Sequence, residues 1–130
     1  MSSRMQIGEL AQRANVSHRT IHYYERIGLL KPAEREGAGY RYYDMTAYQR
    51  LEKIAALKRL GLSLDEIAAV IDLYFEDASG IKGKEKVLAI LEAQIVKTDA
   101  QLTELAAFRR DLESNIARMK SLIDQARRTN

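Results

Sequence analysis

Cysteine is absent from the 130-residue sequence, and histidine occurs only twice, as His18 and His22. The lack of cysteine excludes disulfides, thiolate metal sites and iron–sulfur clusters. The two histidines have an i, i+4 spacing that suits a metal ion, but Glu25 is the only carboxylate near them in the sequence and would not complete a closed site. We therefore predict neither a metal nor another cofactor.

Long apolar runs are also missing. None approaches the roughly 18 residues that a membrane-spanning helix needs, and the first ten residues, MSSRMQIGEL, lack the apolar core of a signal peptide. The content of 46% hydrophobic and 30% charged residues suits a soluble folded chain. We expect a cytoplasmic protein with no membrane partner.

Proline and glycine are confined to the first part of the chain. The single proline and all seven glycines lie at or before Gly83, so residues 84–130 lack the two strongest helix breakers. The small, polar segment 77–83 between these regions has the composition of a linker. We predict a domain over residues 1–76, a linker over 77–83, and a long helix with a short tail over 84–130.

Charge is divided in the same way. The whole chain carries 21 Lys+Arg and 18 Asp+Glu, a net charge of +3. Residues 1–62 contain 11 basic and 6 acidic residues, a net of +5, whereas residues 63–130 have a net of −2. Six of the seven tyrosines fall within residues 23–48. The basic and aromatic residues therefore share the first half of the chain.

Beyond the linker, apolar residues recur with alternating steps of three and four. Nine of eleven such positions are apolar over five heptads, which predicts a coiled-coil helix from about Lys84 to Arg127, roughly 65 Å long. Such a helix cannot bury its stripe alone. It either folds back on its own N-terminal domain or, as we prefer, pairs with a second copy in a homodimer. The predicted dimerisation residues are Leu88, Leu91, Ile95, Leu102, Leu105, Leu112, Ile116, Met119 and Ile123.

The two polar positions of this stripe are Thr98 and Arg109. They either line a site for an effector or set the register of the coil. The residues that flank the stripe are acidic on one side without basic partners on the other, so a parallel pair gains no cross-strand attraction. This pattern weakly favours an antiparallel coil.

Residues 6–27 have the spacing of a helix-turn-helix. Apolar residues mark one face of a first helix over 7–14, Asn15–Ser17 forms the turn, and Ser17 can cap a second helix that Gly28 closes. On the second helix, His18, Arg19 and His22 share or border the face opposite Ile21. A recognition helix presents such side chains to the major groove, although a merely solvated face gives the same pattern.

A short hairpin is predicted next. Gly37–Gly39 forms a turn, and the strand-forming run Tyr40–Tyr43 places Arg41 where it can bind a phosphate, although some of these tyrosines will instead cover a small core. Two helices with capping boxes follow, at Thr46–Gln49 and Ser63–Glu66. Lys58, near the end of the first, either reaches a phosphate or complements the helix dipole.

Six short motifs follow one another along the chain in a specific order: IGELA at 7–11, VS at 16–17, TIHYYE at 20–25, GLL at 28–30, GYRYY at 39–43 and LGLSLDEI at 60–67. In this order they resemble the DNA-binding half of the MerR family of bacterial transcription regulators. The resemblance covers residues 5–72 and implies a mainly α fold, with a winged helix-turn-helix domain and a long C-terminal helix in an antiparallel coiled-coil dimer. It also implies a second wing that ends near Tyr74.

Carried over to this sequence, the family pattern matches recognition-helix contacts at Arg19, His22 and Tyr23 and the wing's phosphate contact at Arg41. Tyr24 either anchors the helix or touches the DNA backbone. The family usually has arginine in place of His22, so either this histidine is protonated beside DNA or Arg19 or Arg26 makes the contact. With the residue patterns above, the predicted DNA-binding set is Ser17, His18, Arg19, His22, Tyr23, Tyr24, Arg26, Tyr40, Arg41 and Lys58.

The resemblance implies a homodimer that binds a palindromic promoter site and distorts the DNA so that RNA polymerase can engage it, as an activator or a repressor. Without cysteine, the expected signal is a non-thiophilic small organic effector, bound between coil, linker and the partner's DNA-binding half, or there is none. We find no nucleophile–base pair, phosphate loop or catalytic carboxylates, so no enzyme is predicted. The alternative is a coiled-coil scaffold or a DNA-architectural protein without effector response.

Overall fold

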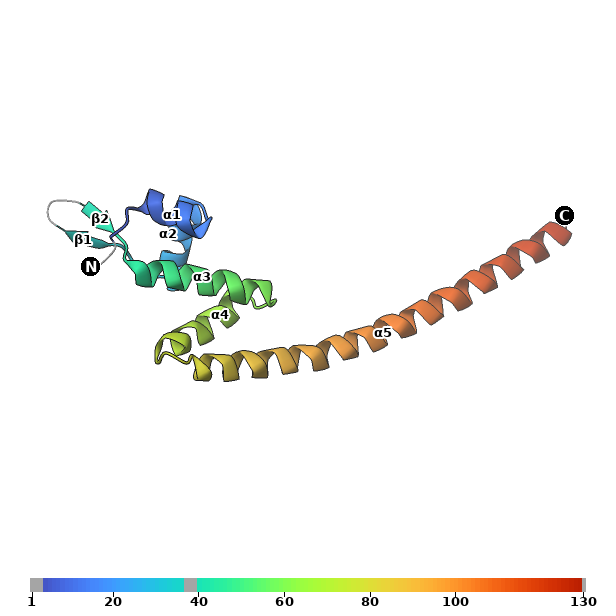
Figure 1. Ribbon diagram of the computed structural model, residues 1–130. Coiled ribbons are helices and arrows are strands. Elements are labelled where there is room, and N and C mark those ends of the chain that lie inside the picture. The colour runs from blue at the N-terminus through green and yellow to red at the C-terminus, as the bar shows by residue number, and fades with distance from the viewer. Residues whose placement is uncertain (1–3, 37–39, 130) are drawn as a thin grey trace. The chain divides into compact units, whose positions relative to one another are not determined.

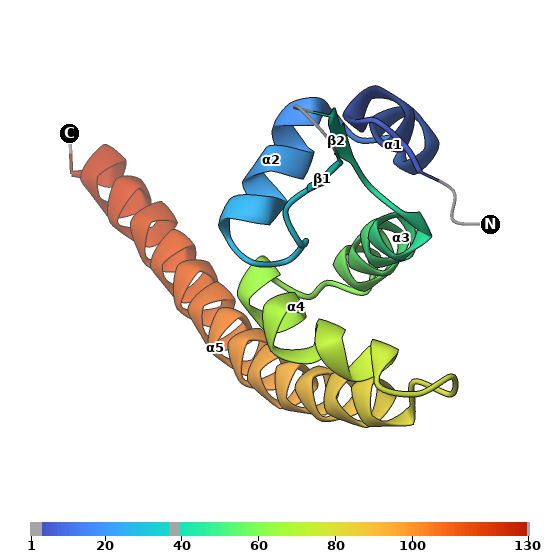
Figure 2. The ribbon, with the colours of Figure 1, turned by 90° about the vertical axis from the view of Figure 1, so that its left-hand side faces the viewer.

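The computed structural model describes residues 4–36 and 40–129. Its two compact units are Met1–Lys86 and Val87–Asn130. As Figures 1 and 2 show, helices dominate the fold and one short hairpin interrupts them, which confirms the mainly α prediction. The elements are α1 (Ile7–Ala14), α2 (His18–Arg26), β1 (Glu34–Glu36), β2 (Tyr40–Tyr42), α3 (Met45–Arg59), α4 (Leu64–Val70), the 3₁₀ helix η1 (Ile71–Phe75) and α5 (Ile81–Arg128).

The turn between α1 and α2 has the geometry that its sequence predicts. Asn15 ends α1 in the left-handed conformation, with φ of 57°, which asparagine tolerates better than most residues. Ser17 then caps α2, because its Oγ accepts a hydrogen bond from the backbone N–H of Thr20 at 3.0 Å. The two helices pack on each other and α1 packs on α3. This is the helix-turn-helix expected for residues 6–27.

Of the two predicted capping boxes, one is present. At the start of α4, Ser63 Oγ accepts from the N–H of Glu66, and Glu66 Oε1 accepts from the N–H of Ser63. At the start of α3 the prediction was wrong. There Asp44 is the cap and accepts from the N–H of Ala47 at 3.3 Å, so Thr46 lies inside the first turn. A carboxylate at the cap also complements the helix dipole, which favours Asp44 over Thr46.

The core of the N-terminal unit draws on α1, α2, α3, α4 and η1 and anchors the hairpin. Backbone hydrogen bonds of 2.7 Å run both ways between Met5 and Tyr43, so the start of the chain pairs with the residue that follows β2. Both side chains are buried. The position of the hairpin is therefore set by the hydrophobic core. The most deeply buried side chains are Met5, Leu10, Ile21, Leu29, Ile54, Leu57, Ile67, Val70 and Ile71.

The helix α5 begins three residues earlier than the sequence predicts, at Ile81. The linker expected over 77–83 is thus shortened, and Gly83 lies within the helix. The ring of Tyr74 packs directly on this glycine: a Cβ added at Gly83 would lie 2.5 Å from Cδ2 of the ring. Gly83 is therefore explained by the close approach of an aromatic ring rather than by a break in the helix.

This contact gives a stability prediction. Alanine favours a helix by about 1 kcal/mol over glycine, yet we expect Gly83→Ala to lower the free energy of unfolding by about 1–3 kcal/mol, because the methyl group overpacks the Tyr74 ring. Gly8→Ala is the matched control, since a Cβ there meets only His18 Nε2 at 3.9 Å. Urea titration followed by circular dichroism measures both variants. Equal stabilisation of the two would contradict the packing argument.

The second unit, Val87–Asn130, contains the remainder of α5. Its stripe is open to solvent in the single chain: Ile95, Leu102 and Leu105 are 64%, 60% and 64% exposed. A continuous stripe of large apolar side chains at such exposure marks an interaction surface. Among the described residues, no helix is both long enough and apolar enough to span a membrane.

Candidate nucleic-acid interface

The helix α2 divides into a buried face and a polar face. Ile21 and Tyr24 are 0% and 5% exposed and fix the helix to the core. His18, Arg19 and His22 are exposed on the other side, as the sequence predicts. The burial of Tyr24 favours its anchoring role over a contact with the DNA backbone. The amphipathic division leaves the N-terminal part of α2 free to enter a groove.

A shallow hollow of about 260 Å³ lies along this polar face. It is lined by Arg19, Thr20, Tyr23 and Arg26, and the guanidinium of Arg26 stacks over the ring of Tyr23 at 5.5 Å. Two guanidinium groups beside an aromatic ring provide both hydrogen-bond donors and a flat apolar surface. Ser17, also in the predicted set, uses its hydroxyl in the helix cap and lies at the N-terminal edge of the same face.

Glu25 is a residue that sequence reasoning considered only as a poor metal ligand. Its Oε1 accepts from the hydroxyl of Tyr43 at 2.8 Å, and its Oε2 accepts from the N–H of Ala33 at 3.1 Å. His22 Nδ1 lies 3.4 Å from Oε1. Burial is the main cause that raises the pKa of Tyr43 far above its ordinary value, and the hydrogen bond to Glu25 is the second cause. One carboxylate thus joins α2 to the residues on both sides of the hairpin.

The hairpin brings together two arginines, of which the sequence singled out only Arg41. In the antiparallel register, Arg35 lies directly opposite Arg41 and Glu34 opposite Tyr42. Both arginines are exposed. Two like charges in this position repel each other and favour an anion that bridges them. The sequence could have predicted this pair, because residues 35 and 41 are equally distant from the centre of the predicted turn and so lie opposite each other in a hairpin.

Other predicted residues of the hairpin are only partly described. The turn residues Gly37–Gly39 lie outside the described residues, and of Tyr40 only the backbone in β2 is described. Tyr42 donates its hydroxyl to Glu34 Oε2 at 2.9 Å, and the Arg4 guanidinium stacks over the Tyr42 ring at 4.6 Å. Arg4 thereby adds a third basic side chain near the hairpin.

The remaining predicted residues lie on α3 and α5. Lys58 is exposed in the last turn of α3, where its charge also suits the helix dipole. On α5, Thr98 donates its hydroxyl to the Gln94 carbonyl at 2.8 Å, which lets a polar residue lie within an apolar stripe. Arg109 is exposed, about 16 Å further along the helix. Within one chain, the two predicted effector residues are therefore not brought together.

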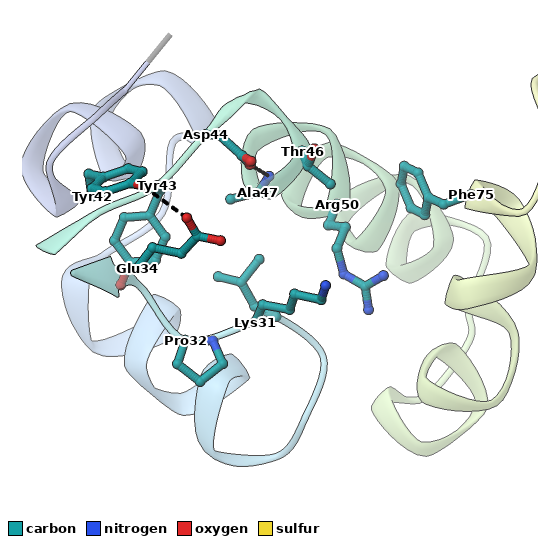
Figure 3. Close-up of a pocket in the computed structure, with 11 residues that line it drawn as sticks. Lys31, Pro32, Glu34, Tyr42, Tyr43, Asp44, Thr46, Ala47, Arg50 and Phe75 are labelled. Carbon is teal, nitrogen blue, oxygen red and sulfur yellow. Dashed lines mark hydrogen bonds between the residues drawn. The ribbon is translucent and has the colours of Figure 1, made fainter. Parts of the chain in front are cut away.

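A cavity of about 300 Å³ lies between the hairpin, the start of α3 and η1 (Figure 3). Arg50 organises this region: its Nε donates to the Leu29 carbonyl at 3.0 Å and its Nη1 to Asp72 at 2.9 Å. The ring of Phe75 lies beneath its guanidinium at 5.7 Å. Arg50 therefore links the loop before β1 to η1. In the described part of the chain, no group of three or more metal-binding side chains is present.

The sequence pattern described as "MerR HTH family regulatory protein" matches residues 5–73, and that of "MerR, DNA binding" matches residues 48–115. The chain belongs to the MerR family. The HTH-type transcriptional regulator HmrR of Rhizobium leguminosarum bv. viciae is 37% identical over 109 residues, 84% of this chain and 81% of HmrR. Nodulation protein NolA of Bradyrhizobium sp. (strain NC92) is 48% identical over 69 residues, 53% of this chain, but these are only 29% of NolA.

Solved structures of MerR-family proteins share the fold. The regulator PbrR691 of Ralstonia metallidurans CH34, in complex with lead(II), has a TM-score of 0.66 and 32% identity, and the match covers 85% of this chain and 83% of PbrR691. EcmrR, in a cryo-EM structure of its DNA complex in EcmrR-RPo, has a TM-score of 0.52 and 28% identity, over 82% of this chain and 38% of EcmrR. The match to PbrR691 covers 85% of this chain and therefore extends beyond residues 5–73, which contain the helix-turn-helix.

Proposed function

We propose that this MerR-family chain is a transcriptional regulator that binds a palindromic promoter site as a homodimer. The observation that carries the proposal is the amphipathic division of α2, with Ile21 and Tyr24 in the core and Arg19 and His22 exposed. The hairpin adds the facing arginines Arg35 and Arg41. A recognition helix beside a basic wing is the arrangement that reads a major groove while holding the adjacent backbone.

The dimer in this proposal forms through α5. The exposed stripe from Leu88 to Ile123 is too long and too regular to remain in water. Two such helices in antiparallel pairing bury both stripes. A two-fold dimer carries two recognition helices, and a palindromic site mirrors that symmetry.

At the promoter, the proposed action is distortion of the DNA between the two half-sites. A protein that bends or untwists DNA reads sequence through its deformability, and the distortion can change how RNA polymerase fits the promoter. The structural relative EcmrR is bound to DNA in an assembly with RNA polymerase, which supports these partners for a MerR-family chain. The proposed signal is a non-thiophilic small organic molecule, since the sequence has no cysteine to hold a soft metal.

Selection from random duplexes of about 40 base pairs tests the proposal. We expect enrichment of an inverted repeat whose half-sites lie about one or more helical turns apart, and a two-to-one complex of protein chains with DNA. A fluorescent base analogue at the centre of the selected site then reports unstacking on binding. Failure to enrich any sequence would favour the scaffold or the DNA-architectural protein. A selected site without central distortion would remove only the proposed mode of action.

A further inference from the structure

The cavity between the hairpin, the start of α3 and η1 has the size and the lining of a small-molecule site. Its volume of about 300 Å³ lies at the lower end of the range for such sites, about 300–1,000 Å³. Much of its wall is formed by one proline and three aromatic rings, those of Pro32, Tyr42, Tyr43 and Phe75. Aromatic walls favour a flat apolar body, because rings stack in offset or edge-to-face arrangements.

Two basic side chains converge on this cavity. Arg50 comes from α3 and is 14% exposed, and Figure 3 shows the side chain of Lys31 extending toward its guanidinium. The bonds of Arg50 to Leu29 and Asp72 use only two of its five N–H donors. Lys31 forms no ion pair with any residue that the structure describes. Two like charges in one cavity repel each other, and a carboxylate between them offsets that repulsion.

The part of the cavity beside the hairpin carries acceptors instead. Within the described residues, each of its two carboxylates uses one oxygen: Glu34 Oε2 accepts from Tyr42, and Asp44 Oδ1 accepts from the N–H of Ala47. The second oxygen of each is left to accept from a ligand. Asp44 precedes Arg50 by six residues, so their backbones lie about 9 Å apart along α3. The cavity therefore complements a molecule with a carboxylate at one end and a hydrogen-bond donor at the other.

We propose that this cavity binds a small aromatic carboxylic acid that carries a donor, such as a phenol hydroxyl, at its far end. The carboxylate lies between Lys31 and Arg50, the ring packs against Pro32 and Tyr43, and the hydroxyl donates to Glu34. A phosphate of the DNA backbone matches the two cations but neither the rings nor the acceptors, so the lining favours the organic acid. The site lies within the N-terminal unit and uses no residue of α5.

The cavity faces the side of the hairpin that its arginines do not use. Glu34 and Tyr42 line it, and since side chains alternate along a strand, the adjacent Arg35 and Arg41 point from the opposite face. A bound acid thus leaves both arginines accessible while it holds the hairpin against α3 and η1. Regulation by this acid rests on the proposed function, whereas binding of the acid does not. Because a fixed hairpin is preorganised for DNA, the acid should tighten binding of the selected duplex by about fivefold or more.

Isothermal titration calorimetry of the full chain, in a buffer without phosphate, tests the site with para-hydroxybenzoate as the probe. We expect saturable binding with a dissociation constant below about 1 mM. Two analogues separate the ends of the probe: para-hydroxybenzamide lacks the charge, and benzoate lacks the donor. Each should bind at least about fivefold more weakly than the probe.

Lys31→Gln should weaken binding of para-hydroxybenzoate by about fivefold or more and should reduce its preference over the benzamide by a similar factor. Lys97→Gln, the same change at an exposed position of α5, is the matched control and should alter neither value. Circular dichroism verifies that both variants are folded. An acid preference that is unchanged in Lys31→Gln would overturn the proposal.

The proposal would also be overturned if no saturable binding of the probe occurred up to about 10 mM, or if inorganic phosphate bound as tightly as the acid. Anisotropy of the selected duplex, with and without saturating probe, then tests regulation. An unchanged DNA affinity would exclude the effector role and leave the site in place. Failure of the proposed function is distinguishable, since no duplex would be selected although calorimetry would still detect the acid.

Discussion

Replacing Leu102 and Leu105 together by glutamate is expected to convert the protein to a monomer and to weaken its binding to the selected duplex by at least about a hundredfold. Both side chains lie in the middle of the α5 stripe and are 60% and 64% exposed in the single chain. In the proposed coil they are buried between two helices. A buried carboxylate without a partner costs several kcal/mol, and each dimer would contain four.

Analytical ultracentrifugation reports the oligomeric state and anisotropy reports the affinity. Ala100→Glu is the control, because it inserts one glutamate, in place of the two of the double variant, at an exposed position off the stripe. We expect this control to remain dimeric with unchanged affinity. The helix itself should persist in the double variant only in part, because a long helix without its partner frays. A double variant that stays dimeric would contradict the coiled-coil proposal.

Arg41→Ala is expected to weaken DNA binding by about tenfold or more without loss of stability in the free protein. Its guanidinium faces Arg35 across the hairpin, so the substitution removes a repulsion between like charges. The free energy of unfolding should therefore stay unchanged or rise slightly. Because a phosphate contact carries no sequence information, the loss should be equal on the selected duplex and on a scrambled one.

Salt titration tests the origin of the effect. Each dimer would lose two phosphate contacts, so the slope of log affinity against log salt should become shallower by about 1.8. Arg35→Ala should behave in the same way if the two arginines share one phosphate. Arg118→Ala, the same change at an exposed position of α5, is the control and should leave affinity and slope unaltered. A loss confined to the selected sequence would show that Arg41 reads a base instead.

Local patterns in the sequence were sufficient to predict where most of the helices begin. Ser17 and Ser63 act as caps because capping depends on backbone within three residues, which the sequence displays directly. The prediction failed at Thr46 because Asp44 offered a competing cap two residues earlier. The predicted linker also extended too far, to residue 83, because Gly83 was interpreted as a helix breaker, whereas α5 begins at Ile81. The contact of Gly83 with the Tyr74 ring is visible only in three dimensions.

The arrangement of the candidate site could be predicted from the sequence where it lies on one helix and not where two elements meet. The exposed face of α2 follows from helical periodicity alone, which identified Arg19 and His22. The bond between Glu25 and Tyr43 spans 18 residues of sequence and depends on how the hairpin docks on α2. Arg50 and Asp72 are 22 residues apart and are joined in the same non-local way. No periodicity carries information about such pairs.

The paired backbone bonds between Met5 and Tyr43 have a practical consequence for handling the protein. They bring the first described residues alongside the hairpin, and Arg4 already stacks on its Tyr42 ring. An affinity tag or fluorophore fused ahead of these residues would therefore start beside the surface proposed to meet DNA. Labels for binding assays are better attached elsewhere, and a purification tag at this end should be cleaved before any affinity is measured.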